Sequence, residues 1–194
     1  MNFPLQLRFK FFALAPQVYV LDAGGADVCY MKQKLFRLRE KVEVFSDSSR
    51  TKLLSTIQAD RMIDFNSSYS FHMADGTTLG SVRRRGIRSL WSAHYEILDG
   101  AGNLVFEIRE QNPIIKFVDG LISGIPLVGM FTGYFLHPRY AVMQNGSPVV
   151  SMTKTPSFIE GRFVIEKSAD LDAQSELRIV FSLLMFVLLE RERG

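Results

Sequence analysis

The densest cluster of positive charge in the sequence is Arg83-Arg84-Arg85 with Arg88, and Trp91 follows it closely. Guanidinium groups bind phosphate and carboxylate groups through paired hydrogen bonds, and an indole ring favours the interface of a membrane. If the segment is a loop, these side chains together could bind an anionic head group. If it is a strand, neighbouring side chains point to opposite faces, and the three consecutive arginines cannot contact one ligand.

A second basic group lies nearer the N-terminus and contains Lys32, Lys34, Arg37, Arg39 and Lys41. Its cations are interspersed with Gln33, Phe36 and Leu38, a pattern typical of strands with one solvated face. We interpret this group as the wet side of strands.

Three acidic residues, Asp170, Asp172 and Glu176, precede the last apolar stretch and could supply oxygen ligands for calcium. The same residues suit the beginning of a helix, where carboxylates stabilise the positive end of the helix dipole and Asp172 occupies the N-cap position. We favour this second interpretation and predict no bound metal and no cofactor.

Signatures of the common enzyme classes are absent from the sequence. There is no GxSxG nucleophile elbow, no glycine-rich phosphate loop and no HExxH zinc motif. The histidines His72, His94 and His137 lie far apart, and Cys29 has no nearby histidine to activate its thiol. We therefore predict that the protein is not an enzyme, although residues distant in sequence can still converge in space.

The chain that must position these residues repeats one pattern, in which an alternating apolar run is followed by a polar turn and a second alternating run. The pattern occurs at residues 18–32, 42–57, 69–82, 95–108 and 140–152. Asp-Gly and Asn-Gly supply the backbone conformations of tight hairpin turns. Further strands are predicted at 162–166 and near the N-terminus. So many antiparallel strands with little helix between them predict a barrel or a sandwich.

The last stretch is apolar on every side of a helix from Leu177 to Leu189, with only Arg178 and Ser182 interrupting. Such a helix must be buried all round, in a membrane or inside a protein shell. At about 1.5 Å per residue the run spans roughly 20 Å, against about 30 Å of hydrocarbon. We therefore predict a core helix at residues 173–191 that the strands enclose. Ser182 can then donate to the carbonyl of Arg178, and Arg178 and Glu190 should mark the two mouths of the barrel.

Residues 112–137 separate the last two hairpins, and the run from Gly120 to Leu136 carries no charge. This run is a second candidate for a membrane span. Against it, Pro126 lies near its centre and its glycines weaken a helix and shorten the apolar length. We predict a short helix and a Gly/Pro-rich connection near residues 112–130, and no transmembrane helix.

The composition fits one domain over residues 1–194, long enough to bury a sizeable core, with 47% hydrophobic residues and 16 Phe. The net charge of +3 and a pI near 9.1 permit weak attraction to anionic lipid without implying a nucleic-acid binder. A single cysteine excludes an internal disulfide and fits a reducing compartment. The apolar run at residues 11–15 is too short for a signal peptide, so we expect a cytoplasmic protein.

Several motifs in the sequence resemble those of a known protein family. They are YSFHMADGTTLG at 69–80, SVRRRGIRSLW at 81–91, YEILDGAGN at 95–103, HPRY at 137–140 and FVIE at 163–166, followed by the apolar helix. Together they resemble the LURP-one-related family, which belongs to the tubby-like superfamily with the phospholipid scramblases. The resemblance implies a mainly β fold, a roughly twelve-stranded antiparallel closed barrel that encloses a hydrophobic C-terminal helix.

The resemblance also implies a range of functions. Tubby domains bind phosphoinositide head groups through Lys and Arg on the barrel wall, and scramblases are assigned calcium-dependent lipid movement. We therefore expect a non-enzymatic binding module, peripheral to the membrane, that recognises an anionic phospholipid, a phosphoinositide or a protein partner. One alternative is a scramblase-like membrane protein with an inserted apolar helix. A second is a small-ligand-binding barrel or an unrecognised enzyme, which requires an unfilled interior cavity.

Overall fold

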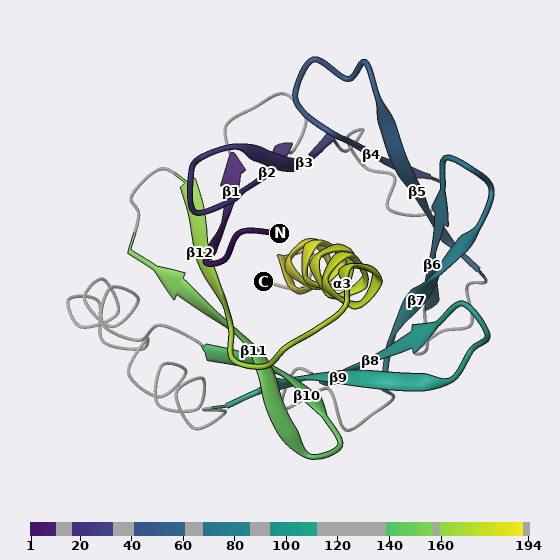
Figure 1. The fold of residues 1–194 in the computed structure, drawn as a ribbon, viewed down its shortest axis with the longest axis vertical. Coiled ribbons are helices and arrows are strands. Elements are labelled where there is room, and N and C mark those ends of the chain that lie inside the picture. Colours follow the sequence, from purple (N-terminus) through teal and green to yellow (C-terminus); the bar gives the residue numbers. More distant parts are fainter. Residues whose placement is uncertain are drawn as a thin grey trace, which may run out of the picture.

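The strands form one closed antiparallel barrel in the computed structural model, and the helix α3 (Ala173–Arg191) runs through its middle (Figure 1). The structure describes residues 1–10, 17–32, 41–60, 68–85, 94–111, 139–156 and 160–191. The strands are β1 (Leu5–Lys10), β2 (Gln17–Leu21), β3 (Asp27–Lys32), β4 (Val42–Phe45), β5 (Leu53–Ala59), β6 (Ser68–Met73), β7 (Thr78–Arg84), β8 (His94–Asp99), β9 (Leu104–Glu110), β10 (Arg139–Gln144), β11 (Ser147–Thr155) and β12 (Glu160–Lys167). Each strand pairs with its neighbours in sequence, and β1 pairs with β12 to close the ring.

This architecture confirms the predicted fold class, a mainly β barrel of twelve antiparallel strands that encloses a hydrophobic C-terminal helix. The core helix has the predicted bounds. The short helix and the Gly/Pro-rich connection predicted near residues 112–130 lie outside the described residues.

The hairpins form where the polar turns predict them. β10 and β11 are joined through Asn145 (φ 50°) and Gly146 (φ 82°), the left-handed conformations that an Asn-Gly turn favours. In the β8–β9 turn, Asp99 Oδ1 accepts hydrogen bonds from the backbone N–H groups of Ala101 and Asn103 at 2.9 and 2.8 Å. Local sequence therefore determines both the place and the shape of these turns.

Successive strands run in opposite directions, so the tight turns all lie at the same end of the barrel. They are the β2–β3, β4–β5, β6–β7, β8–β9 and β10–β11 turns. The same end holds the beginning of α3, because α3 follows β12. We call this end the turn mouth and the opposite end, which the helix reaches at Glu190, the far mouth.

The helix is buried all round, as predicted. From Ile179 to Leu188 no side chain is more than 8% exposed. The hydroxyl of Ser182 donates to the carbonyl oxygen of Arg178 at 2.8 Å, which satisfies the polar group inside the core. Within the described residues, no helix combines the length and the apolar character needed to cross a membrane.

Aromatic contacts hold the helix against one side of the barrel, mainly β6, β7 and β8. Phe181 contacts Phe71 edge-on, with ring centroids 5.9 Å apart. Phe186 lies between Tyr95 and Tyr140, with ring centroids 5.3 and 4.6 Å away. Edge-to-face pairs of this kind add to the stabilisation that burial already provides.

Candidate functional site

The predicted arginine cluster lies in and just after β7, so the strand interpretation applies to it. Arg83 and Arg85 lie on the outer side, where the Nε of Arg83 donates to Glu96 Oε2 at 2.6 Å. Arg85 lies 3.5 Å from Glu96 Oε1 and 3.6 Å from Glu107 Oε1. Both guanidinium groups therefore face carboxylates of the neighbouring strands β8 and β9.

Two more side chains complete this group. Arg109 forms an ion pair with Glu107, and the Nε2 of His94 lies 3.6 Å from the same carboxylate. Burial lowers the pKa of His94 and outweighs the opposite effect of Glu107, so the ring is neutral at physiological pH. We call these residues the paired wall, since three guanidinium groups share two carboxylates; they are Arg83, Arg85, His94, Glu96, Glu107 and Arg109.

Arg84 lies on the other side of the strand. It is opposite Tyr95 in the β7–β8 register, and Tyr95 faces the helix. Tyr95 donates to Glu190 Oε1 at 2.8 Å; burial and the charge of Glu190 raise the pKa of Tyr95, and the charge of Arg84 opposes this rise. Arg83, Arg84 and Arg85 therefore do not converge on one ligand. The other predicted members, Arg88 and Trp91, lie outside the described residues.

The predicted acidic candidates act at the beginning of α3. The Oδ1 of Asp172 accepts a hydrogen bond from the backbone N–H of Ser175 at 2.9 Å, which is the expected N-cap contact. Glu176 accepts hydrogen bonds from the amine of Met1 at 2.8 Å and from the Nζ of Lys167 at 2.6 Å. Asp170 is exposed. Within the described residues, no group of three His, Cys, Asp or Glu side chains is placed to hold a metal ion.

The residues considered for catalysis are separated as well. Cys29 is fully buried, and burial raises the pKa of its thiol to about 12, which keeps it protonated and unreactive. His72 lies on β6 near Thr78, with 3.4 Å between Nδ1 and Oγ1. His137 lies outside the described residues.

A group of cations lies on the outer faces of β1, β3 and β12; the sequence marked Lys32 as a solvated strand residue but did not join it to Arg8 and Lys10. On β1 the burial alternates, so that Leu5, Leu7 and Phe9 are buried while Arg8 and Lys10 lie on the outer face. The alternation was visible in the sequence. The sequence did not show that these cations lie beside cations of other strands, because that depends on which strands pair.

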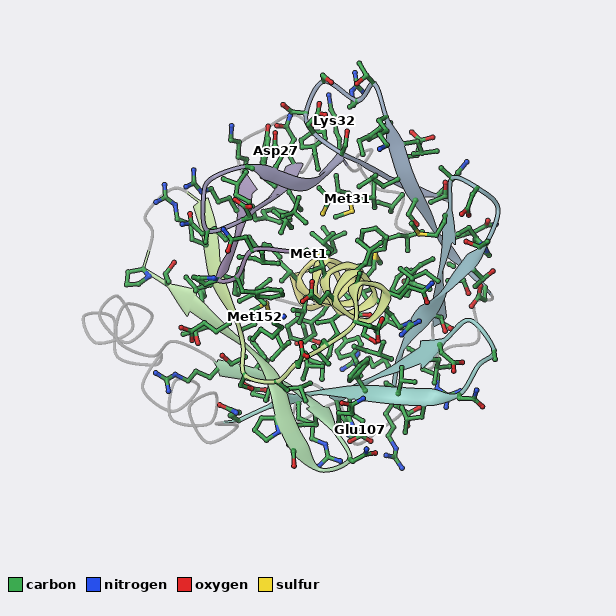
Figure 2. The ribbon with its side chains drawn as sticks, viewed as in Figure 1. Met1, Asp27, Met31, Lys32, Glu107 and Met152 are labelled. Carbon is green, nitrogen blue, oxygen red and sulfur yellow. The ribbon has the colours of Figure 1, made fainter. Side chains whose placement is uncertain are left out.

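The pairing brings the cations together. Arg8 lies opposite Arg162 on β12 and opposite Tyr19 on β2. Lys10 and Lys32 both lie opposite Gln17 of β2, from its two sides. We call Arg8, Lys10, Tyr19 and Lys32 the basic wall. Figure 2 shows Lys32 of the basic wall and Glu107 of the paired wall on opposite sides of the barrel.

The basic wall differs from the paired wall in its partners. Among the described residues, no carboxylate forms an ion pair with Arg8, Lys10 or Lys32, although Glu160 of β12 is the register partner of Lys10. The Nη2 of Arg8 donates to Gln6 Oε1 at 2.9 Å, and the Nζ of Lys10 lies 4.9 Å from the centroid of the Tyr19 ring.

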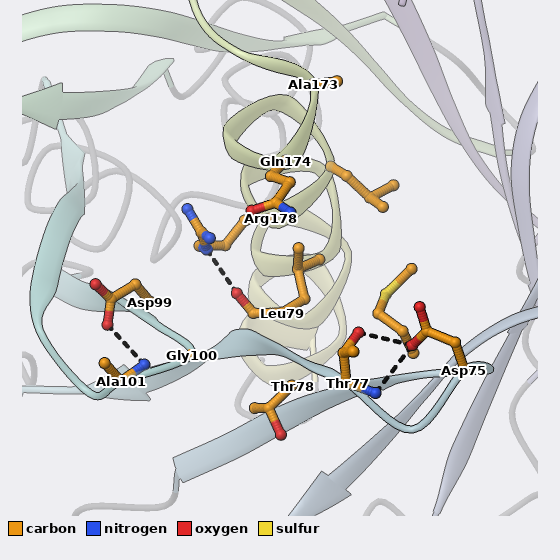
Figure 3. Close-up of a pocket in the computed structure, with 12 residues that line it drawn as sticks. Asp75, Thr77, Thr78, Leu79, Asp99, Gly100, Ala101, Ala173, Gln174 and Arg178 are labelled. Atoms are coloured by element: carbon orange, nitrogen blue, oxygen red, sulfur yellow. Dashed lines mark hydrogen bonds between the residues drawn. The ribbon is translucent and has the colours of Figure 1, made fainter.

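A cavity of about 670 Å³ opens at the turn mouth, beside the first turns of α3 (Figure 3). The β6–β7 turn, the β8–β9 turn and α3 form its walls. Arg178 lines it and is only 8% exposed, with its Nε donating to the carbonyl oxygen of Leu79 at 2.8 Å. This position beside the turns agrees with the prediction that Arg178 marks a mouth.

Gly80 makes room for the Arg178 side chain. A Cβ at residue 80 would lie 2.2 Å from the carbonyl oxygen of Leu98 and 3.0 Å from the Nε of Arg178. The backbone of Gly80 also has a φ of 150°, which disfavours other residues. The absent side chain therefore lets a buried guanidinium approach β7.

Comparisons with known proteins place the fold in context. No family model matches the chain, and no curated protein matches it in sequence. A similar solved structure is the X-ray structure of a protein from Arabidopsis thaliana, which is 13% identical and has a TM-score of 0.51. The match covers 100% of this chain and 94% of the plant protein. At this identity the likeness concerns the fold, and the chain therefore shares its barrel architecture with that plant protein over its whole length.

Proposed function

We propose that this protein is a non-enzymatic binding module whose basic wall docks on membranes that contain anionic phospholipid. The observation that carries the proposal is the lack of ion pairs with carboxylates for Arg8, Lys10 and Lys32 among the described residues. Lys10 and Lys32 are exposed and Arg8 is half-buried, so the two lysines present most of this charge to a negatively charged surface. The resemblance to tubby-like proteins, which bind head groups on the barrel wall, supports the same proposal.

The physical basis is electrostatic, with one aromatic contribution. Each Lys or Arg near an anionic leaflet contributes about 1 kcal/mol, and the attraction declines within a Debye length of about 8 Å at physiological salt. Tyr19 is half-buried and adds a ring with a polar tip, which suits the membrane interface. A surface of this size gives weak, reversible and salt-sensitive binding.

The proposal is tested by co-sedimentation with vesicles of phosphatidylcholine alone and of phosphatidylcholine with phosphatidylserine. The unchanged protein should sediment only with the anionic vesicles. The variant Lys10→Gln with Lys32→Gln removes about 2 kcal/mol of attraction, so its partition coefficient should fall about thirtyfold. Binding of the unchanged protein should also weaken steadily as salt is added.

A matched control separates a local surface from net charge. Arg139 and Lys154 are exposed on β10 and β11, and Arg139→Gln with Lys154→Gln removes the same charge elsewhere. The control should retain most of the binding. Failure of the unchanged protein to bind anionic vesicles, or equal weakening by both double variants, contradicts the proposal.

The scramblase-like alternative requires a different location for the apolar segments of the chain. It requires α3 or the run from Gly120 to Leu136 to lie in lipid. In the structure α3 lies inside the barrel, and residues 120–136 lie outside the described residues. Membrane-bound protein that resists carbonate and high salt would favour that alternative, whereas complete release by salt favours peripheral docking.

A further inference from the structure

The cavity at the turn mouth is lined by the largely buried guanidinium group of Arg178, whose charge adds to the effect of hydrogen bonds in lowering the pKa values of Asp99 and Asp172. Arg178 donates from its Nε to Leu79, but its two terminal nitrogens make no hydrogen bond and no ion pair with the described residues. The side chain is only 8% exposed and lines the cavity. The two terminal nitrogens are accessible to solvent at the cavity, so an acceptor on a ligand would replace water there. These donors are therefore placed to receive an acceptor from inside the cavity.

The other charges of the cavity are negative and come from the two turns. Asp99 uses both carboxylate oxygens within its own turn, since Oδ1 accepts from Ala101 and Asn103 and Oδ2 accepts from the side chain of Asn103. Asp75 uses only Oδ1, which accepts from the N–H and the hydroxyl of Thr77. Its Oδ2 accepts no hydrogen bond from the described residues, and Figure 3 shows Asp75 at the edge of the cavity away from Arg178.

This charge arrangement selects among ligands. The cavity lining carries one positive and two negative side chains, namely Arg178, Asp75 and Asp99. A simple anion is repelled by the two carboxylates, and a phosphate dianion more strongly than a carboxylate. A simple cation is repelled by Arg178. A molecule with both charges meets an opposite charge at each end, and the planar guanidinium matches the two oxygens of a carboxylate.

The cavity also offers apolar surface. Met73, Leu79 and Leu177 line it together with the charged groups, and its volume lies within the range of small-molecule pockets. A ligand with a short hydrocarbon portion between or beside its charges can cover these side chains.

We propose that the turn-mouth cavity binds a small zwitterion, an amino acid or a similar molecule, whose carboxylate pairs with Arg178 and whose ammonium group lies near Asp99 or, in a longer molecule, near Asp75. This inference goes beyond membrane docking and involves none of the residues of the basic wall. It gives the barrel a soluble ligand at one mouth in addition to the proposed contact along its side.

The test uses the whole protein and a series of probes that differ in charge and length. Glycine, leucine, 4-aminobutanoate and 6-aminohexanoate are titrated while amide and Arg Nε signals are followed by NMR. The best zwitterion should shift the signals of residues 77–79, 99–101 and 174–178. Its N-acetyl derivative lacks the positive charge and its amide lacks the negative charge, so each should bind at least about tenfold more weakly.

Two outcomes overturn the proposal. If no zwitterion of the series shifts these signals, the cavity does not bind this class of ligand. If the N-acetyl derivative binds as tightly as its parent, the cavity is a simple anion site and Asp75 and Asp99 have no part in recognition.

Variants locate the binding. Arg178→Gln should abolish it; because that buried substitution can also impair folding, Ala101→Trp and Gln174→Trp provide a second route. Both residues are exposed at the cavity rim, and a large ring there should weaken binding at least about tenfold without touching Arg178. Ala23→Trp is the matched control, because Ala23 is exposed in the β2–β3 turn outside the cavity lining. If folded Ala101→Trp and Gln174→Trp proteins bind like the control, the site is not this cavity.

Discussion

The two ends of α3 are held in the barrel by different kinds of contact. At the turn mouth the anchors are polar: Asp172 caps the helix, Glu176 binds two amines, and Arg178 donates to Leu79. From Ile179 onwards apolar packing dominates until Tyr95 meets Glu190 at the far mouth. Apolar packing is non-directional, whereas hydrogen bonds require particular atoms at particular distances. The apolar part therefore places the helix inside, and the polar part sets its depth and rotation.

The largest loss of stability is expected from a substitution in the apolar part of α3. Leu184 is fully buried, and Leu184→Asp places an unpaired charge in the core. The cost is comparable with the entire stability of a domain, about 5–15 kcal/mol, so the variant should not fold. Circular dichroism and solubility measure the outcome. A folded, soluble variant would show that the helix does not lie inside the barrel.

A smaller loss is expected where the helix packs on aromatic rings. Phe186 is 1% exposed and touches Tyr95 and Tyr140, so Phe186→Ala should reduce the free energy of unfolding by about 3–5 kcal/mol. Urea denaturation measures the change. Leu104 is 51% exposed, and Leu104→Ala is the control, with a loss below about 0.5 kcal/mol. Equal losses for the two variants would contradict the packing described for the helix.

At the polar end, Glu176→Gln should cost about 1–3 kcal/mol, because it weakens two charge-assisted hydrogen bonds. Burial on its own would raise the pKa of Glu176, but the hydrogen bonds and charges of Lys167 and the Met1 amine outweigh it and hold the pKa below its ordinary value. A carboxyl group with a lowered folded pKa adds stability above its ordinary pKa and loses it as the pH falls through the folded pKa.

The pH dependence is therefore a second readout for Glu176. The difference in unfolding free energy between the unchanged protein and Glu176→Gln should be full at neutral pH and shrink as the pH falls below the ordinary pKa of a glutamate and through the lowered pKa of Glu176. A difference that stays constant down to strongly acidic pH would mean that the carboxylate charge has no role in anchoring the helix.

The smallest effect concerns the helix cap. Asp172→Ala removes the acceptor for the Ser175 N–H and should cost about 1 kcal/mol. Asp170→Ala, two residues earlier and exposed, is the matched control and should change stability by less than about 0.5 kcal/mol. Thermal denaturation of the three proteins side by side measures both. If the two variants are equally stable, Asp172 is not an effective cap.

The sequence predicts the barrel well because its signals are local. Asn145-Gly146 defines a turn by itself, and the run from Leu177 to Leu189 defines a buried helix by itself. The sites depend on register, which local signals do not supply. Arg83 is neutralised by Glu96 only because the two residues are opposite each other in the β7–β8 pair. Arg8 meets Arg162 only across the closing seam.

The contacts of Arg178 also could not be predicted from the sequence. Its position near a mouth follows from the interruption of the apolar run. Its bond to Leu79 is made to a backbone oxygen, which every residue carries and no sequence pattern marks. The cavity beside it also depends on Gly80, whose role appears only when β7 is placed against the helix.

The seam between β1 and β12 has a consequence for how the protein is made on the ribosome. β1 emerges before the other described strands, but its partner β12 and the helix that fills the interior are synthesised after them. Until then the apolar inner faces of the finished hairpins have nothing to enclose. Folding therefore waits for the end of this region, and contacts between such distant segments form slowly. The nascent chain is for that period a natural client for chaperones that cover exposed apolar surface.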